Sequence, residues 1–128
     1  MRHVVALFGE AEKGQFHVPY LLREMPQLID VLGNPPPESE GLFFAIQALL
    51  FQRELIYFRV ESEGFDLVKY QHGIKLLEDR EKVKMLHAIC LPGVGDEKII
   101  DATKRLCEIH NSILIATQKD LYDYLTSF

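Results

Sequence analysis

The sequence predicts a single α/β domain in which helices alternate with the strands of a small, mostly parallel sheet. Continuous apolar runs at 4–8, 88–91 and 113–116 are typical of strands that are buried on both faces. Segments with a helical spacing of apolar residues separate these runs along the chain. Because crossover helices cover both faces of a parallel sheet, this alternation indicates helices on both faces.

Length and composition also favour one globular unit. The chain has 128 residues, of which 48% are hydrophobic and 26% are charged, and a chain of this size buries a core without needing disulfides or a metal. No segment has the composition of a long linker. We therefore expect residues 1–128 to form a single domain.

Prolines and glycines set the expected boundaries in the first part of the chain. Gly9 ends the first strand, and Pro19 suits the first turn of a helix that continues to Met25. Pro26 either kinks this helix or begins a second short one, which Gly33 ends. In chain order we expect strand 4–8, helical segments 19–25 and 26–32, helix 42–52, strand 55–60, helix 67–77, strand 88–91, helix 97–110, strand 113–116 and helix 118–125.

Right-handed crossovers leave few arrangements for four such strands. We expect a Rossmann-like domain with the flavodoxin-like strand order 2-1-3-4, counted along the chain. This order places the strand 55–60 at an edge of the sheet, which agrees with the charged Arg59 inside it.

Charge and targeting patterns exclude several classes of protein. The net charge is −5 and the basic residues are scattered, so a nucleic-acid surface is not expected. The densest basic group, at 75–84, is interleaved with acidic residues and is typical of a solvated helix end. The first apolar run is too short for a signal peptide, and no run is long enough to cross a membrane. Because both cysteines lie outside any paired or metal-binding spacing, we expect reduced thiols and a cytoplasmic protein.

Two glycine-rich loops provide the strongest functional signal. They span 9–14 and 92–96, after the first and third predicted strands. In the order 2-1-3-4 these strands flank the point where the strand order reverses, and ligands bind there in open parallel sheets. Glycine lets backbone amides approach a ligand closely, and the second loop leads into a helix N-terminus, which favours anions. The expected binding residues are Gly9, Glu10, Lys13, Gly14, Gly93, Gly95, Asp96 and Thr117.

These loops predict a domain that binds a nucleotide or another phosphorylated metabolite. Neither loop contains the G-x-G-x-x-G pattern or the G-K-[ST] ending of a phosphate loop, so the ligand, any cofactor and any reaction stay open. Each loop could equally be a tight turn. The acidic residues that follow the strands could hold Mg²⁺ or could be solvated, and among the histidines only His17 follows the first strand. The sequence assigns no metal site and no catalytic residue.

An assembly module is the alternative function. The helix 42–52 is apolar almost all round, and such a helix is either covered on every side or exposes a surface that associates. Under this alternative the chain is non-catalytic and forms a homo-oligomer. The expected contact residues are Phe43, Phe44, Leu50 and Phe51.

Overall fold

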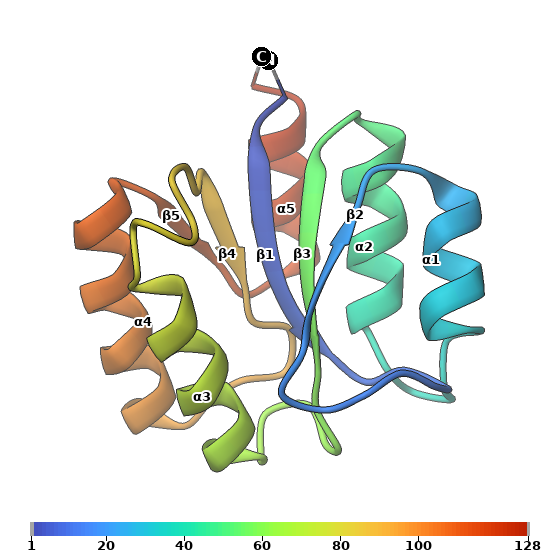
Figure 1. Ribbon diagram of the computed structural model, residues 1–128, viewed down its shortest axis with the longest axis horizontal. Coiled ribbons are helices and arrows are strands. Elements are labelled where there is room, and N and C mark those ends of the chain that lie inside the picture. Colours follow the sequence, from blue (N-terminus) through green and yellow to red (C-terminus); the bar gives the residue numbers. More distant parts are fainter. Residues whose placement is uncertain (1, 128) are drawn as a thin grey trace.

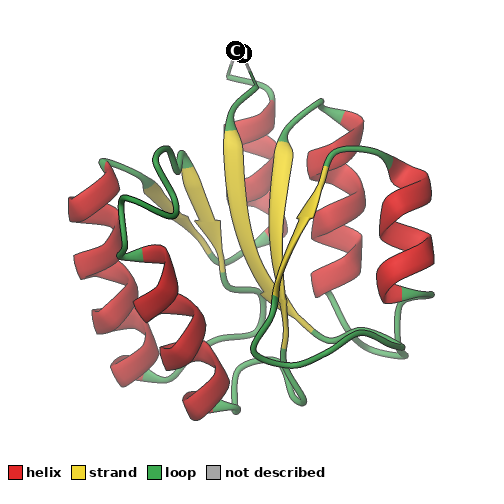
Figure 2. Cartoon of the chain, viewed as in Figure 1, coloured by secondary structure: helices red, strands yellow, loops and turns green. Residues whose placement is uncertain are grey.

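The computed structural model describes residues 2–127 and contains one five-stranded sheet with helices on both of its faces (Figure 1). Its elements are β1 (Val4–Gly9), β2 (Pro19–Leu22), α1 (Met25–Leu32), α2 (Gly41–Leu50), β3 (Glu54–Arg59), α3 (Leu67–Leu77), β4 (Ala88–Cys90), α4 (Glu97–His110), β5 (Ile113–Ile115) and α5 (Gln118–Leu125). Helices α1, α2 and α5 cover one face of the sheet, whereas α3 and α4 cover part of the other (Figure 2). Among the described helices, none combines the length and the apolar character that crossing a membrane requires.

The sheet confirms a mostly parallel α/β arrangement and adds one strand to it. The strand order is β2-β3-β1-β4-β5, and within it β3, β1, β4 and β5 pair in parallel. These four are the predicted strands, and their relative order agrees with the expected one. The prediction of a four-stranded sheet was wrong, because β2 pairs antiparallel with β3 and makes the sheet mixed.

The extra strand overturns two further expectations. Pro19 begins an edge strand instead of the expected helix, and the start of an edge strand tolerates proline because its nitrogen need not donate to the ladder. Tyr20 and Leu22 pack toward the core shared with α1 and α2, while Leu21 is 73% exposed. Strand β3 therefore lies inside the sheet, and Arg59 at its end is not on an edge strand.

Side chains cap the starts of α4 and α5, and a capping box marks the start of α1. Pro26 lies in the first turn of α1, so the expected second short helix is the one that forms. The Gln27 side chain accepts a hydrogen bond from the Arg23 amide at 2.8 Å, which fixes the change from β2 to α1. Asp96 and Thr117 cap α4 and α5 with their side-chain oxygens, as their positions predict.

Two apolar cores lie on the two faces of the sheet. Alternation along β1 sends Val5 and Leu7 into the core with α1, α2 and α5, and sends Ala6 and Phe8 into the core with α3 and α4. Helices pack about 8–10 Å apart and strands about 4.8 Å apart, so two helices cover roughly four strands. The face with α3 and α4 is therefore left open over β2 and part of β3, beside Leu21.

Candidate functional site

At the carboxyl ends of the strands, the side chain of Glu63 takes the position expected for a ligand. One of its carboxylate oxygens accepts hydrogen bonds from the backbone amides of Glu10 (2.8 Å) and Gly41 (2.9 Å), and the other accepts from Glu40 (2.8 Å). Gly41 is the first residue of α2, so the carboxylate lies at a helix N-terminus, which attracts anions. The chain thus supplies its own anion at this position.

Glu10 and Glu63 hold two loops together by reciprocal hydrogen bonds. The Glu10 carboxylate accepts from the Glu63 amide at 3.0 Å, and the Tyr57 hydroxyl donates to the Glu10 carbonyl at 2.7 Å. Burial and, secondly, the negative charge of Glu63 raise the pKa of Tyr57 well above its ordinary value. Tyr57 is therefore a neutral donor that fixes the loop rather than a base.

Gly9 is required here for close packing. A Cβ at Gly9 would lie 2.5 Å from the Tyr57 hydroxyl oxygen and 2.6 Å from Cα of Gly41, which is closer than such atoms can approach. The glycine therefore lets β1 and the start of α2 pack together, a role that glycine also has in dinucleotide-binding turns. Gly93 lies beside Glu63 with a φ of 78°, which its turn requires.

The first glycine loop uses its amides within the protein. The amides of Glu12 and Lys13 donate to the Leu32 carbonyl at the end of α1, at 3.1 and 3.2 Å. The Gly14 carbonyl accepts from the Arg59 guanidinium at 2.5 Å. These amides thus satisfy a helix C-terminus instead of forming a cradle for a phosphate.

The second half of the expected site is mostly structural. Asp96 caps α4 by accepting from the Lys98 amide at 2.8 Å, and Thr117 caps α5 by accepting from the Asp120 amide at 3.1 Å. Gly95 is exposed, and a Cβ on it would meet no heavy atom within 4 Å. Of the expected binding residues, those that surround Glu63 are Gly9, Glu10 and Gly93.

Other reactive groups do not join the Glu63 cluster. His17 packs edge to face against His72 of α3, with ring centres 4.6 Å apart. Burial raises the pKa of the Cys90 thiol, which keeps it protonated. Within residues 2–127, no group of three or more His, Cys, Asp or Glu side chains is arranged to hold a metal ion.

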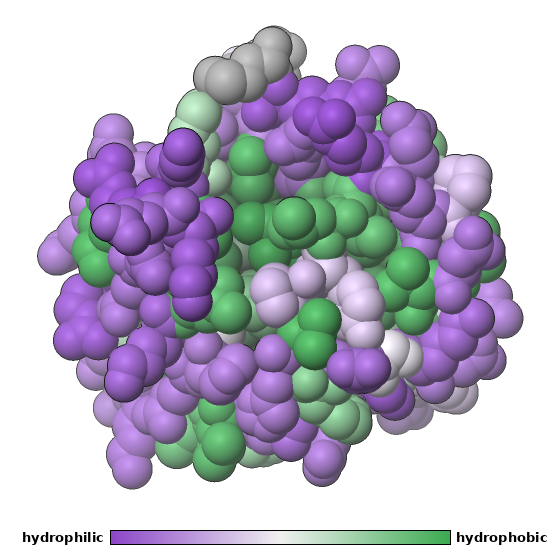
Figure 3. Space-filling model, in the orientation of Figure 1, coloured by the Kyte–Doolittle hydropathy of each residue, from purple (hydrophilic) through white to green (hydrophobic). Residues whose placement is uncertain are grey.

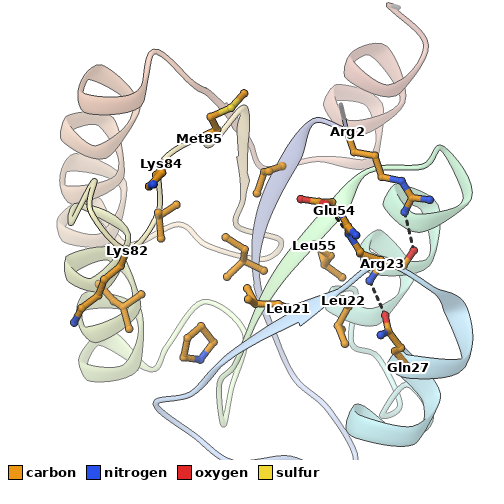
Figure 4. A pocket seen from close by; sticks show the side chains of 15 residues that line it. Arg2, Leu21, Leu22, Arg23, Gln27, Glu54, Leu55, Lys82, Lys84 and Met85 are labelled. Carbon is orange, nitrogen blue, oxygen red and sulfur yellow. Dashed lines mark hydrogen bonds and ion pairs between the residues drawn. The ribbon is translucent and has the colours of Figure 1, made fainter.

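A groove of about 720 Å³ lies at the other end of the sheet, over β2, β3 and the amino end of β1. Figure 3 shows an apolar area between two hydrophilic flanks on this side of the molecule. Leu21 and Ile56 contribute to the apolar floor. One wall is the segment 82–85 after α3, and the opposite wall contains Arg23 and Gln27 at the start of α1 (Figure 4).

Basic side chains come from both walls of the groove. Its described lining includes Arg2, Arg23, Lys82 and Lys84, with Glu54 as the one acidic residue. Arg23 pairs with Glu54 and Arg2 with Glu24, whereas neither lysine forms an ion pair with another residue of the described chain. The lysines lie on the wall opposite the arginines (Figure 4). The groove therefore carries positive charge in a chain whose net charge is −5.

One wrong expectation and one incomplete expectation hide this groove from the sequence. The sequence predicts a helix where strand β2 forms, so the predicted sheet does not include Leu21. Lys82 and Lys84 are exposed beyond the end of α3, as expected for solvated side chains, but they also line the groove together with Val83 and Met85. The strict alternation of lysine with an apolar residue in this segment is the signal that could have found it.

Comparisons with known proteins identify no relative. The chain matched no protein-family model, no curated protein and no solved structure. The geometry and the charges of the molecule itself therefore indicate what it binds.

Proposed function

We propose that this chain is a small-ligand-binding domain on a Rossmann-like scaffold, and that its ligand is an organic anion with an apolar body. The groove of about 720 Å³ beside Leu21 carries the proposal, because it combines an apolar floor with a basic rim. Pockets of about 300–1,000 Å³ with mostly apolar walls and few polar groups are typical of small-molecule sites. The proposal keeps the small anionic ligand expected from the sequence and moves it to the amino ends of the strands.

The charge of the rim selects the head group. A carboxylate or phosphate between the walls would gain charge-assisted hydrogen bonds from Lys82 or Lys84. Lysine stems can lie along apolar surface while their ammonium groups stay near water, so the head group belongs at the rim. A cationic ligand would meet uncompensated positive charge in the same place.

The floor selects the rest of the ligand. Leu21 on the floor exposes 73% of its surface and Met85 on the adjoining wall exposes 38%, although both are large apolar side chains. Covering apolar surface contributes about 25 cal/mol per Å², so an alkyl chain or a ring system gains free energy by lying on this floor. Together the floor and the rim favour an amphipathic acid.

A phosphorylated metabolite at the carboxyl ends is the second candidate. The three amides that bind the Glu63 carboxylate would also suit a phosphate. Such a ligand would have to displace Glu63, which is tethered beside the amides and competes at a high effective concentration. For this reason we favour the groove.

A thermal-shift and calorimetric comparison of four decyl compounds tests the proposal. Decanoate and decyl phosphate carry an anionic head group, while decanol and decyltrimethylammonium keep the chain and change the head. We expect both anions to raise Tm by binding the native state, decanol to raise it less, and the cation to leave it unchanged. Equal binding of all four, or binding of none, refutes the proposal. In the same screen, a rise with ATP and Mg²⁺ but not with decanoate would favour the carboxyl-end candidate.

Charge reversal of the lysines locates the site. The double variant Lys82→Glu, Lys84→Glu changes the groove, and the matched variant Lys98→Glu, Lys104→Glu makes the same change of net charge on exposed positions of α4. We expect the first to weaken decanoate binding about tenfold, or about 1.4 kcal/mol, and the second to have no effect. Equal losses would mean that net charge, and not the groove, controls binding.

A polar substitution tests the floor in the same way. Leu21→Asp places a carboxylate in the groove, and Val68→Asp places one at a position of similar exposure outside it; these side chains are 73% and 68% exposed. Because both positions are exposed, both variants should fold. We expect decanoate binding to be lost only in Leu21→Asp, and unchanged binding in that variant contradicts the proposed position of the ligand.

A further inference from the structure

Helices α2 and α5 lie on the face of the sheet opposite to α3 and α4 (Figure 1). Their outer surface exposes apolar side chains. Phe43 is 44% exposed, Leu50 62%, Phe51 39% and Tyr122 64%. We call these four residues, together with Gln47 and Gln118, the aromatic patch. Single exposed apolar side chains are common on protein surfaces, but neighbouring large ones are typical of interaction sites, so the patch requires an explanation.

The inner faces of α2 account for only part of its apolar sequence. Leu42, Phe44 and Leu49 are buried in the core with the sheet, α1 and α5. A helix covered on one side is polar on the other side in a monomeric protein, but α2 has the sequence GLFFAIQALL without a charged residue. Phe44 is fully buried, so among the expected contact residues those on the surface are Phe43, Leu50 and Phe51.

A small depression lies inside the aromatic patch, between the two helices. Its volume is about 180 Å³, and buried Leu121 and Leu125 line it together with Phe43, Phe51 and Tyr122. It is smaller than the range of about 300–1,000 Å³ that small-molecule pockets occupy. The depression therefore suits one inserted side chain, and the patch itself offers such side chains in its projecting rings.

The charges in and around the aromatic patch favour a second copy of the chain as its partner. The residues that line the depression carry no formal charge, and the flanking Lys119 and Asp123 of α5 pair with each other at 2.9 Å. A second copy of the chain brings the same neutral surface and the same paired charges, so two patches can meet without like-charge repulsion. The groove could not meet its own copy in this way, because its rim has an excess of positive charge.

We propose that two copies of this chain associate through the aromatic patch about a twofold axis, with an aromatic side chain of each copy in the depression of the other. Twofold contacts of this kind use the same surface on both copies, and aromatic side chains in desolvated pockets dominate the binding energy of interfaces. Because the groove lies on the other face of the sheet, both grooves stay open in the pair.

Sedimentation velocity over a series of protein concentrations tests the proposal. Phe43→Glu and Tyr122→Glu introduce a charge into the patch, and Phe65→Glu and Val68→Glu introduce one at positions that are 83% and 68% exposed outside it. We expect the wild type and the two controls to form dimers, and each patch variant to raise the dimer dissociation constant at least about tenfold, as buried interface charges do. All four positions are exposed, and circular dichroism with Tm checks that each variant folds.

Two results would overturn the proposal. One is a wild type that stays monomeric at the highest concentration, and the other is a loss of association in the controls equal to that in the patch variants. Neither result affects decanoate binding, so the outcome is independent of the proposed function of the groove. A protein that stays monomeric and still binds decanoate would therefore refute the proposed dimer and leave the proposed function of the groove intact.

Discussion

The hydrogen bonds of Glu63 give a direct test of how the carboxyl end of the sheet is closed. Glu63→Gln keeps the shape of the side chain and removes its charge. One oxygen can still accept from the Glu10 and Gly41 amides, although as a neutral acceptor, while the new NH₂ group faces the Glu40 amide and cannot accept from it. The substitution thus weakens two hydrogen bonds and replaces the third by a contact between two donors.

The expected loss of stability follows from these three bonds. A hydrogen bond to a charged group contributes about 1.5–3 kcal/mol and a neutral one about 1 kcal/mol, so the change costs about 3–4 kcal/mol if the site is fully buried. Partial exposure of Glu63 reduces this to about 2–3 kcal/mol. A domain of 128 residues has a free energy of unfolding of about 6–19 kcal/mol, so the loss is large. With an m-value of about 1–3 kcal/mol per molar, the urea midpoint should fall by about 0.7–3 M.

Glu61→Gln is the matched control for this measurement. Its side chain is 65% exposed and pairs with Lys69 at 3.3 Å, and an exposed pair of this kind contributes less than about 1 kcal/mol. We expect Glu63→Gln to lower the midpoint far more than Glu61→Gln. If the two variants lose the same stability, water already satisfies the amides around Glu63, and the idea of an internally occupied anion position is wrong.

Three further predictions concern packing, pH and thiol chemistry. Gly9→Ala should cost about 1–3 kcal/mol in urea unfolding, because its Cβ would lie 2.6 Å from Cα of Gly41, whereas Gly95→Ala, with open space around it, should be neutral. Burial and the nearby His3 lower the pKa of His87 below 6.5. Stability should therefore fall as the pH drops through about 6.5, because the unfolded chain takes up the proton first. Urea midpoints at pH 7.5 and 5.5 should differ less in His87→Asn than in the wild type. Burial raises the pKa of Cys90, so this thiol should react with a disulfide reagent only on unfolding, and rapid reaction in the native state would contradict this.

The sequence predicts an element best when its pattern is compatible with only one kind of secondary structure. The apolar run of β1 and the caps Asp96 and Thr117 have a single interpretation, and the structure agrees with it. Pro19 has two possible interpretations, because the first turn of a helix and the start of an edge strand both tolerate proline. The four residues of β2 are too few for their alternation to decide between them.

The site is harder to predict because its contacts are distant in sequence. Glu63 is one of several acidic residues that follow strands, and its spacing does not show that it turns back to amides 53 and 22 residues away, at Glu10 and Gly41. Gly9 has the same ambiguity, since glycine serves the close approach of a ligand and that of a helix equally well. In the structure, the lack of a side chain at Gly9 lets the start of α2 pack closely against β1.

Helix dipoles act in opposite senses at Glu63 and beside the C-terminus of α3. Helix N-termini attract anions and helix C-termini attract cations. The start of α2 is accordingly met by Glu63, and the groove at the amino ends of the strands lies near the C-terminus of α3, through Leu76. An anionic ligand beside α3 therefore receives no help from that helix, and on this wall it depends on side chains such as Lys82 and Lys84, while the start of α1 lies on the opposite wall.

This difference predicts a salt dependence for binding in the groove. Attraction by exposed lysines is screened when the Debye length falls from about 10 Å at 0.1 M to about 3 Å at 1 M salt, whereas apolar burial is not weakened by salt. We expect the affinity for decanoate to fall as sodium chloride is raised, while decanol binds equally well or better. Calorimetric titration of both ligands into the wild type and into Lys82→Glu, Lys84→Glu provides the measurement. If the salt dependence of decanoate is the same in both proteins, the lysines do not hold the head group, and the groove binds its ligand through the apolar floor alone.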